Sequence, residues 1–174
     1  AQAVLLDQET HVLAVDVPLS SPQAILTGLH IAFQTDDDGK PSGDVLPGGD
    51  GQPATAEVRV DRPLPNQSTW GTATFNTPVR LQAAQRAWLV LQSTDGRAFW
   101  DATPGSAQPP AVLAPPLLDS DDGGLSWRAA TVTTSTQPLA ALLRLRHTVD
   151  HFTIPVQLQI GSGPTAVRRK LNEF

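Results

Sequence analysis

Apolar and polar residues alternate with a period of two along many short segments of this chain, and clusters of Gly, Pro, Asp and Asn separate the segments. The clearest case is residues 25–34, which end at a dense run of turn-forming residues. Such alternation predicts a strand with one buried face. The segments that we interpret as strands are 11–17, 25–34, 54–61, 70–75, 87–91, 98–101, 139–147 and 152–160, with one more strand at Trp127.

Several segments depart from simple alternation. Residues 87–91 are continuously apolar, which predicts a central strand covered on both faces, with Trp88 in the core. Residues 94–97 contain an Asp-Gly pair that is typical of tight hairpins, so we expect 98–101 to be the return strand. Residues 104–116 are too rich in proline for a central strand and predict a surface excursion. The end of the chain, 166–174, predicts a short helix.

Many short strands without intervening helices predict an all-β fold. Because parallel sheets need crossover helices, we expect an antiparallel two-sheet sandwich of the jelly-roll or Greek-key type. The 174 residues are enough for one domain with one sizeable core. We place the sandwich in residues 1–160 and a C-terminal basic tail in residues 161–174, where Arg168, Arg169 and Lys170 are adjacent.

Composition limits the classes of function. Twelve basic and seventeen acidic residues give a net charge of −5 without a basic stripe, so we expect no nucleic-acid partner. The absence of cysteine excludes disulfides and thiol chemistry. No segment reaches the ~20 apolar residues of a membrane span, so we expect no membrane insertion. Because the chain starts at Ala1 and contains no methionine, we expect it to be processed or part of a longer protein.

Six features in chain order carry a family resemblance. They are residues 25–33, 38–43, 75–83, 87–91 and 99–100, and a final strand that contains a Trp. Over residues 11–147 this arrangement resembles the choice-of-anchor R type of jelly-roll domain, which occurs on secreted, surface-anchored and phage-associated bacterial proteins. The resemblance implies a display or binding module without catalysis, at an extracellular, surface or particle-associated location.

The segment Ser120–Trp127 fits the Asp-box pattern S-x-D-x-G-x-[ST]-W completely. In this pattern an Asp side chain accepts turn amides, a Gly takes a positive φ, and the Trp packs beneath the turn. Propeller enzymes such as sialidases repeat the pattern in several blades, whereas here it occurs once in a chain too short for a propeller. We therefore expect a stable hairpin. No nucleophile elbow or zinc-protease motif accompanies it, so we expect no enzyme.

Asp36, Asp38 and Asp44 are the candidate metal ligands, because calcium takes carboxylate oxygens in irregular loops. The spacing is not that of an EF-hand, and such a loop can satisfy its own amides with Asp side chains. We expect a solvated turn and no cofactor, with calcium as the alternative. His147 and His151 lie four residues apart, but between predicted strands rather than on a helix, so we expect ordinary surface histidines.

The four tryptophans are the residues on which a sugar could stack. Core packing is the default for all of them, and Trp70 and Trp127 are expected to pack against the ends of the sandwich. Trp100, beside the proline-rich segment, is the best candidate for exposure. We select Trp100, Asp101 and Trp127 as the candidate ligand-binding residues.

Two functions follow from these expectations. The first is a non-catalytic binding or display module that recognises a carbohydrate or a protein through loops at one end of the sandwich. The alternative is a structural subunit of a larger assembly, such as a phage tail, a baseplate or a contractile injection particle. The strand at 152–160, which the family resemblance does not cover, and the basic tail favour this alternative.

Overall fold

The computed structural model describes residues 1–94, 98–104, 113–130, 139–148, 157–160 and 167–170. Strands make up 60% of it and no described residue lies in a helix, which confirms the predicted all-β class. The strands are β1 (Gln2–Leu5), β2 (Thr10–Ser20), β3 (Leu29–Asp37), β4 (Lys40–Val45), β5 (Thr55–Val60), β6 (Thr69–Leu81), β7 (Arg86–Ser93), β8 (Phe99–Trp100), β9 (Ala102–Pro104), β10 (Leu113–Asp119), β11 (Arg128–Ala129), β12 (Leu139–Ala141), β13 (Arg144–His147), β14 (Gln157–Ile160) and β15 (Val167–Lys170).

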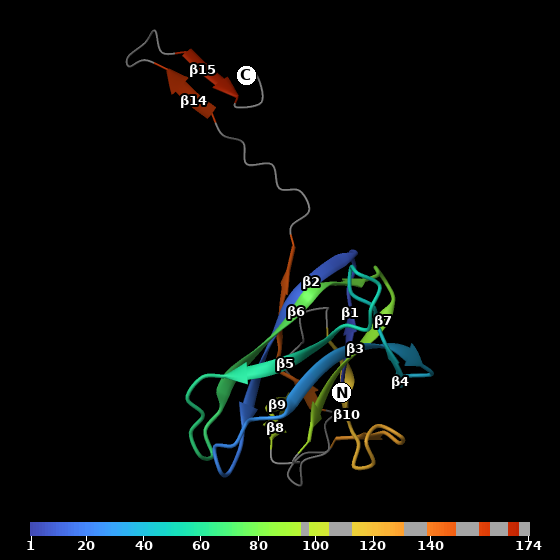
Figure 1. Ribbon diagram of the computed structural model, residues 1–174. Helices are drawn as coiled ribbons and strands as arrows, with labels where there is room; N and C mark the ends of the chain where they lie inside the picture. The colour runs from blue at the N-terminus through green and yellow to red at the C-terminus, as the bar shows by residue number, and fades with distance from the viewer. Residues whose placement is uncertain (95–97, 105–112, 131–138, 149–156, 161–166, 171–174) are drawn as a thin grey trace.

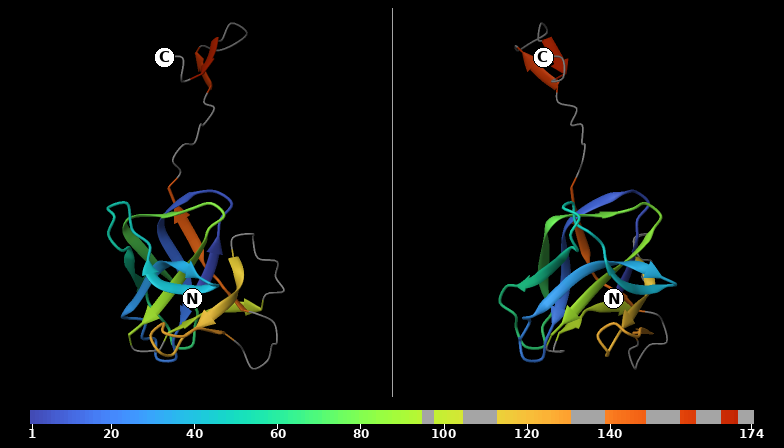
Figure 2. Two further views of the ribbon diagram at one scale, coloured as in Figure 1. Left: turned by 90° about the vertical axis from the view of Figure 1, so that its right-hand side faces the viewer. Right: turned by 45° about the vertical axis from the view of Figure 1, so that its right-hand side comes forward.

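Among the described strands, eleven form one antiparallel sheet. Its order is β11-β10-β1-β7-β3-β5-β6-β2-β13, with β4 as a further partner of β3 and β8 as a further partner of β2. The sheet curves, so that β2 and β3 lie on opposite sides of the core (Figures 1 and 2). The other described strands pair as two small sheets, β9 with β12 and β14 with β15.

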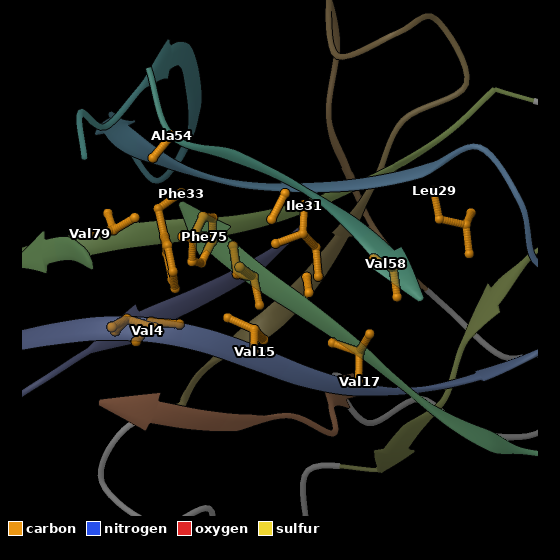
Figure 3. Packing of buried hydrophobic residues seen from close by; sticks show 14 of the residues in the cluster. Val4, Val15, Val17, Leu29, Ile31, Phe33, Ala54, Val58, Phe75 and Val79 are labelled. Carbon is orange, nitrogen blue, oxygen red and sulfur yellow. The ribbon is translucent and has the colours of Figure 1, made fainter. Parts of the chain in front are cut away.

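β5 links the two sides of the curved sheet. Residues Thr55–Glu57 pair with β3, and residues Val58–Val60 pair with β6. Apolar side chains of β2, β3, β5 and β6 point toward one another in the space between (Figure 3). The rings of Phe33 on β3 and Phe75 on β6 have their centroids 5.9 Å apart. Removal of these side chains from water is the main force that holds the two sides together.

β7 is a central strand, as its apolar run predicts. It pairs with β1 along one edge and with β3 along the other. Ala87 and Leu89 belong to the main core, whereas Trp88 and Val90 belong to a second cluster with residues of β1 and β10 on the outer face of the sheet. Trp88 is only 1% exposed. The continuous apolar sequence therefore reflects burial on both faces.

The predicted return strand beside β7 was wrong. Phe99–Trp100 forms β8, which pairs with Leu19 and Ser20 of β2. β3 pairs with one edge of β7 as far as Ser93, and on the other edge β1 pairs with Arg86–Leu89. The Asp-Gly pair that suggested the hairpin lies at 95–96, outside the described residues.

The proline-rich segment was only in part a surface excursion, since its end forms β10. In this strand Gln2 pairs with Leu117, but the next residue of β1, Ala3, pairs with Ala114. Pro115 and Pro116 thus fall in a bulge where they have no register partner on β1. Because proline has no N–H to donate, a bulge is where a paired strand tolerates it.

The helix predicted near the C-terminus was also wrong. Val167–Lys170 is a strand that pairs antiparallel with Gln157–Ile160. A segment of this length is too short to hold a helix without tertiary packing, because isolated helices below about 12–15 residues are marginal. The segment beyond the predicted boundary at residue 160 therefore contains β15, and the rest of it lies outside the described residues.

Candidate ligand-binding site

A cavity of about 1110 Å³ is lined by residues of β8, β9 and the β10–β11 hairpin. These elements lie together at the bottom of Figure 1. The described residues that line the cavity come from the end of β7, from the β8–β9 segment and from both sides of the Asp-box turn. Trp100, Asp101 and Trp127 are all among them. The fold therefore brings the three predicted ligand-binding residues to one cavity.

The Asp box forms the predicted hairpin turn, with β10 and β11 as its arms. Asp122 accepts the amide of Ser126 at 2.9 Å and the hydroxyl of Ser126 at 2.5 Å. The hydroxyl of Ser120 donates to Asp122 at 2.8 Å and accepts the amide of Gly124 at 2.8 Å. Gly124 has a φ of +93°, the left-handed conformation that favours glycine. These contacts confirm the roles expected of the Asp and the Gly.

The carboxylates of this hairpin accept several hydrogen bonds. The hydroxyl of Ser126, followed by its amide and by the hydroxyl of Ser120, holds the pKa of the Asp122 carboxyl far below its ordinary value. On the adjoining strands, Arg128 Nη2 lies 2.5 Å from a carboxylate oxygen of Asp121 and 3.2 Å from one of Asp119. Asp122 is therefore ionised at neutral pH, and charge-assisted hydrogen bonds hold the turn beside the cavity in place.

Trp127 lies between the cavity and the outer face of β7. It packs against the cluster that contains Trp88 and Leu118, which confirms its predicted place beneath the turn. A Cβ atom at Gly124 would lie 3.4 Å from the Trp127 ring, so the turn closes tightly over it. Trp127 Nε1 is buried and has no hydrogen-bond partner among the described residues. An unpaired buried donor of this kind is costly in the folded state.

Trp100 and Asp101 are held by backbone contacts. The indole of Trp100 donates to the carbonyl of Leu142 at 2.7 Å. Asp101 donates its amide to Pro18 at 3.0 Å and accepts the amide of Leu142 at 3.1 Å. One carboxylate oxygen of Asp101 accepts the hydroxyl of Ser20 at 3.2 Å. Both side chains are thus placed before any ligand arrives, which lowers the entropic cost of binding.

Among the lining residues that were not selected from the sequence, Phe99 and His30 are the most instructive. Phe99 is 59% exposed, and its position follows from strand alternation, because Trp100 beside it packs against the core. That signal could have identified Phe99. His30 also lines the cavity, and it is brought there by the pairing of β3 with β7. No local sequence pattern could have revealed this placement.

The three candidate metal ligands lie in the β3–β4 hairpin, outside the cavity. Asp36 accepts the indole N–H of Trp88 at 2.7 Å, and Asp38 occupies the turn with a φ of +50°. The amide of Asp44 donates to the hydroxyl of Ser42 at 3.0 Å. Across the described part of the chain, no three His, Cys, Asp or Glu side chains gather in a way that could hold a metal ion.

The two candidate histidines are only partly covered by the structure. His147 lies on β13, where its Nδ1 is 3.1 Å from the carbonyl oxygen of Thr148. His151 lies outside the described residues.

Comparisons with known proteins yield no relative. No protein-family model, no curated protein and no solved structure matches this chain. None of the described segments forms a helix with the length and apolar character needed to cross a membrane.

Proposed function

We propose that the protein is a non-catalytic binding or display module that recognises a carbohydrate in the cavity described above. The observation that carries the proposal is the meeting of Trp100, Asp101 and Trp127 in one cavity. Binding sites for small ligands combine apolar and aromatic walls with a few well-placed polar groups, and this lining has that composition.

The lining suits a neutral sugar. Aromatic side chains of Phe99, Trp100 and Trp127 offer apolar surfaces to the C–H groups of a sugar ring. Asp101 can accept sugar hydroxyl protons. The unpaired indole N–H of Trp127, which is buried in the free protein, can donate to a sugar oxygen once the ring turns toward the ligand. Asp119 and Asp121 also line the cavity, so a negatively charged ligand would meet repulsion there.

The proposal includes a finer description of the fold. In it, the curved sheet is a two-sheet sandwich of jelly-roll or Greek-key type, with β5 as the strand that passes between the sheets. The split pairing of β5 and the contact of Phe33 with Phe75 across the core support this description. The cavity then lies among the loops at one end of the sandwich. The choice-of-anchor resemblance supports an extracellular, surface or particle-associated location.

The test is a panel of immobilised neutral and acidic oligosaccharides. We expect retention of neutral glycans, and at least a tenfold weaker affinity for Trp127→Phe, which keeps an aromatic ring but loses the N–H donor. Asp101→Asn should weaken binding similarly, whereas Asp61→Asn, an equal charge change on an exposed residue outside the cavity lining, should not. Failure to bind any neutral glycan, or equal binding by all variants, would refute the proposal.

A structural subunit of a larger assembly is the second candidate. One observation favours it, namely that β14 and β15 pair with each other and with no other described strand. Such a hairpin could contact a neighbouring subunit. Sedimentation of the purified chain distinguishes the two functions, since a module is expected to stay monomeric and an assembly subunit to form particles.

A further inference from the structure

Trp70 is a tryptophan outside the cavity, on the outer face of the sheet formed by β5, β6, β2 and β13. Trp70 on β6 is 41% exposed, so the default expectation of core packing was wrong for this residue. Its neighbour Gly71 faces the core, where an added Cβ would lie 2.7 Å from the side chain of Val58 and 2.9 Å from that of Val60. Strand alternation therefore turns Trp70 outward.

An arginine lies on this outward-facing ring. The guanidinium carbon of Arg144, on β13, is 4.1 Å from the centroid of the Trp70 ring. Arg144 is exposed and makes no ion pair with any described residue. A guanidinium group stacked on an aromatic ring keeps its N–H donors free at its edges, in the fork that matches a carboxylate.

The buried acid beside Arg144 already has its own charged partner. Asp16 on β2 lies next to Arg144 in the sheet register. Both of its oxygens accept hydrogen bonds from Arg146 at 2.8 Å, and one also accepts the hydroxyl of Thr72 at 2.7 Å. Asp16 therefore does not need Arg144 as a partner. The charge of Arg144 remains available to a ligand.

Arg59, another cation on this outer face, has an exposed acidic neighbour on its own strand, which Arg144 lacks. Arg59 on β5 is aligned with Thr72 across the sheet, so it shares this face. Glu57, two residues earlier on the same strand, also shares it and is exposed, which offsets the charge of Arg59. Arg144 thus stacks on an aromatic ring and, among the described residues, has no acidic partner.

We propose that Trp70 and Arg144 form a binding site for an acidic sugar, separate from the cavity. The sugar carboxylate accepts two hydrogen bonds from the Arg144 guanidinium, and the apolar side of the sugar ring lies against the exposed part of Trp70. This chemistry is complementary to that of the cavity, whose acidic lining repels such a ligand. The site stands on its own contacts and does not depend on the function proposed for the cavity.

Isothermal titration with oligogalacturonate, with its neutral galactose counterpart as a control, tests the site. We expect oligogalacturonate to bind and the neutral oligosaccharide to bind at least tenfold more weakly at this face. Arg144→Gln should weaken oligogalacturonate binding at least tenfold. Arg144→Lys, which keeps the charge but loses the fork, should recover only part of it. Trp70→Ala should weaken binding as well, with the fold checked by circular dichroism.

Arg80→Gln is the matched control, because it removes the same charge from an exposed β6 residue that pairs with Glu9 instead. It should leave binding unchanged, and so should Trp127→Phe, which separates this site from the cavity. The proposal is overturned if Arg80→Gln is as harmful as Arg144→Gln. It is equally overturned if dextran sulfate competes with oligogalacturonate as well as a carboxylated polymer does, since that result would indicate charge attraction alone.

Discussion

The outer surface of the sheet differs sharply between two regions. Over β7 and β1 it is covered, because the Asp-box hairpin places Trp127 on a cluster that contains Trp88 and Val90. Over β6, β2 and β13 no described segment packs on the outer face as that hairpin does, and it presents Trp70, Arg144 and a network around Asp16. The same sheet thus has one outer region built for packing and another that faces solvent.

The two regions differ in sequence as they do in structure. Residues 87–90 are apolar at every position, whereas in residues 71–75 buried Gly, Ala and Phe alternate with outward-facing threonines. An aromatic residue in the first pattern is explained by burial. An aromatic residue at an outward position of the second pattern is not explained in this way, and the proposed Trp70–Arg144 site gives it a role.

The largest expected effect separates the two regions by stability. Trp88→Ala should lower the free energy of unfolding by roughly 3–5 kcal/mol, the range for deletion of a large buried aromatic side chain. Trp70→Ala should cost clearly less than that, since 41% of Trp70 is already exposed to solvent in the folded protein. Denaturant melts measure both values. Equal losses in the two variants would remove the distinction between a covered and an open face.

Asp36→Ala tests how the covered region satisfies its polar groups. It leaves the buried indole N–H of Trp88 without its acceptor, so we expect a loss of about 1–3 kcal/mol in the free energy of unfolding. Asp37→Ala, next to it and paired only with Lys40 at 3.9 Å, is the control and should change stability by less than about 0.5 kcal/mol. If the two variants melt alike, the Asp36–Trp88 hydrogen bond does not contribute.

The Asp-box hairpin should give the covered region a pH-dependent stability. Because hydrogen bonds lower the pKa of Asp122 in the folded state, its carboxylate stabilises the fold fully above the pKa of the unfolded chain, about 4. That contribution is lost as the pH falls toward the lower folded-state pKa. The difference in Tm between the wild type and Asp122→Asn should therefore be greatest near neutral pH and shrink in acid. A constant difference would contradict this role.

The smallest expected effect concerns calcium. Asp36 is engaged by Trp88 and Asp38 by the turn itself, so millimolar calcium and a chelator should give the same Tm. A rise of the Tm in calcium that disappears in the double variant Asp36→Ala/Asp38→Ala would make the β3–β4 hairpin a metal site.

Local patterns predicted much of this fold. Alternation located β3, β5 and the start of β6, and the apolar run identified β7 as central, because these signals arise from burial of single residues. The Asp box predicted its own turn because all its hydrogen bonds are local. Pairings between distant segments were not predictable, as β8 shows by joining β2 rather than β7. β1 and β10 were missed because a four-residue strand and a bulge with two prolines carry little pattern.

The candidate site shows the same limit. Trp100 and Trp127 were selected for their residue type and their neighbouring loops, and their meeting in one cavity depends on long-range pairing. His30 belongs to that cavity only through the register of β3 on β7. Trp70 and Arg144 come together because β2 lies between their strands, an arrangement that no local pattern contains.

The most direct test of the central claim is a titration followed by the indole N–H resonances of the four tryptophans in a ¹⁵N-correlation spectrum, assigned with Trp→Phe variants. The titrant is the neutral oligosaccharide that binds best in the panel. The account predicts that the Trp127 and Trp100 resonances shift in a saturable way, while those of Trp88 and Trp70 stay in place. Saturable binding that leaves the Trp100 and Trp127 resonances unmoved would show that the cavity is not the binding site.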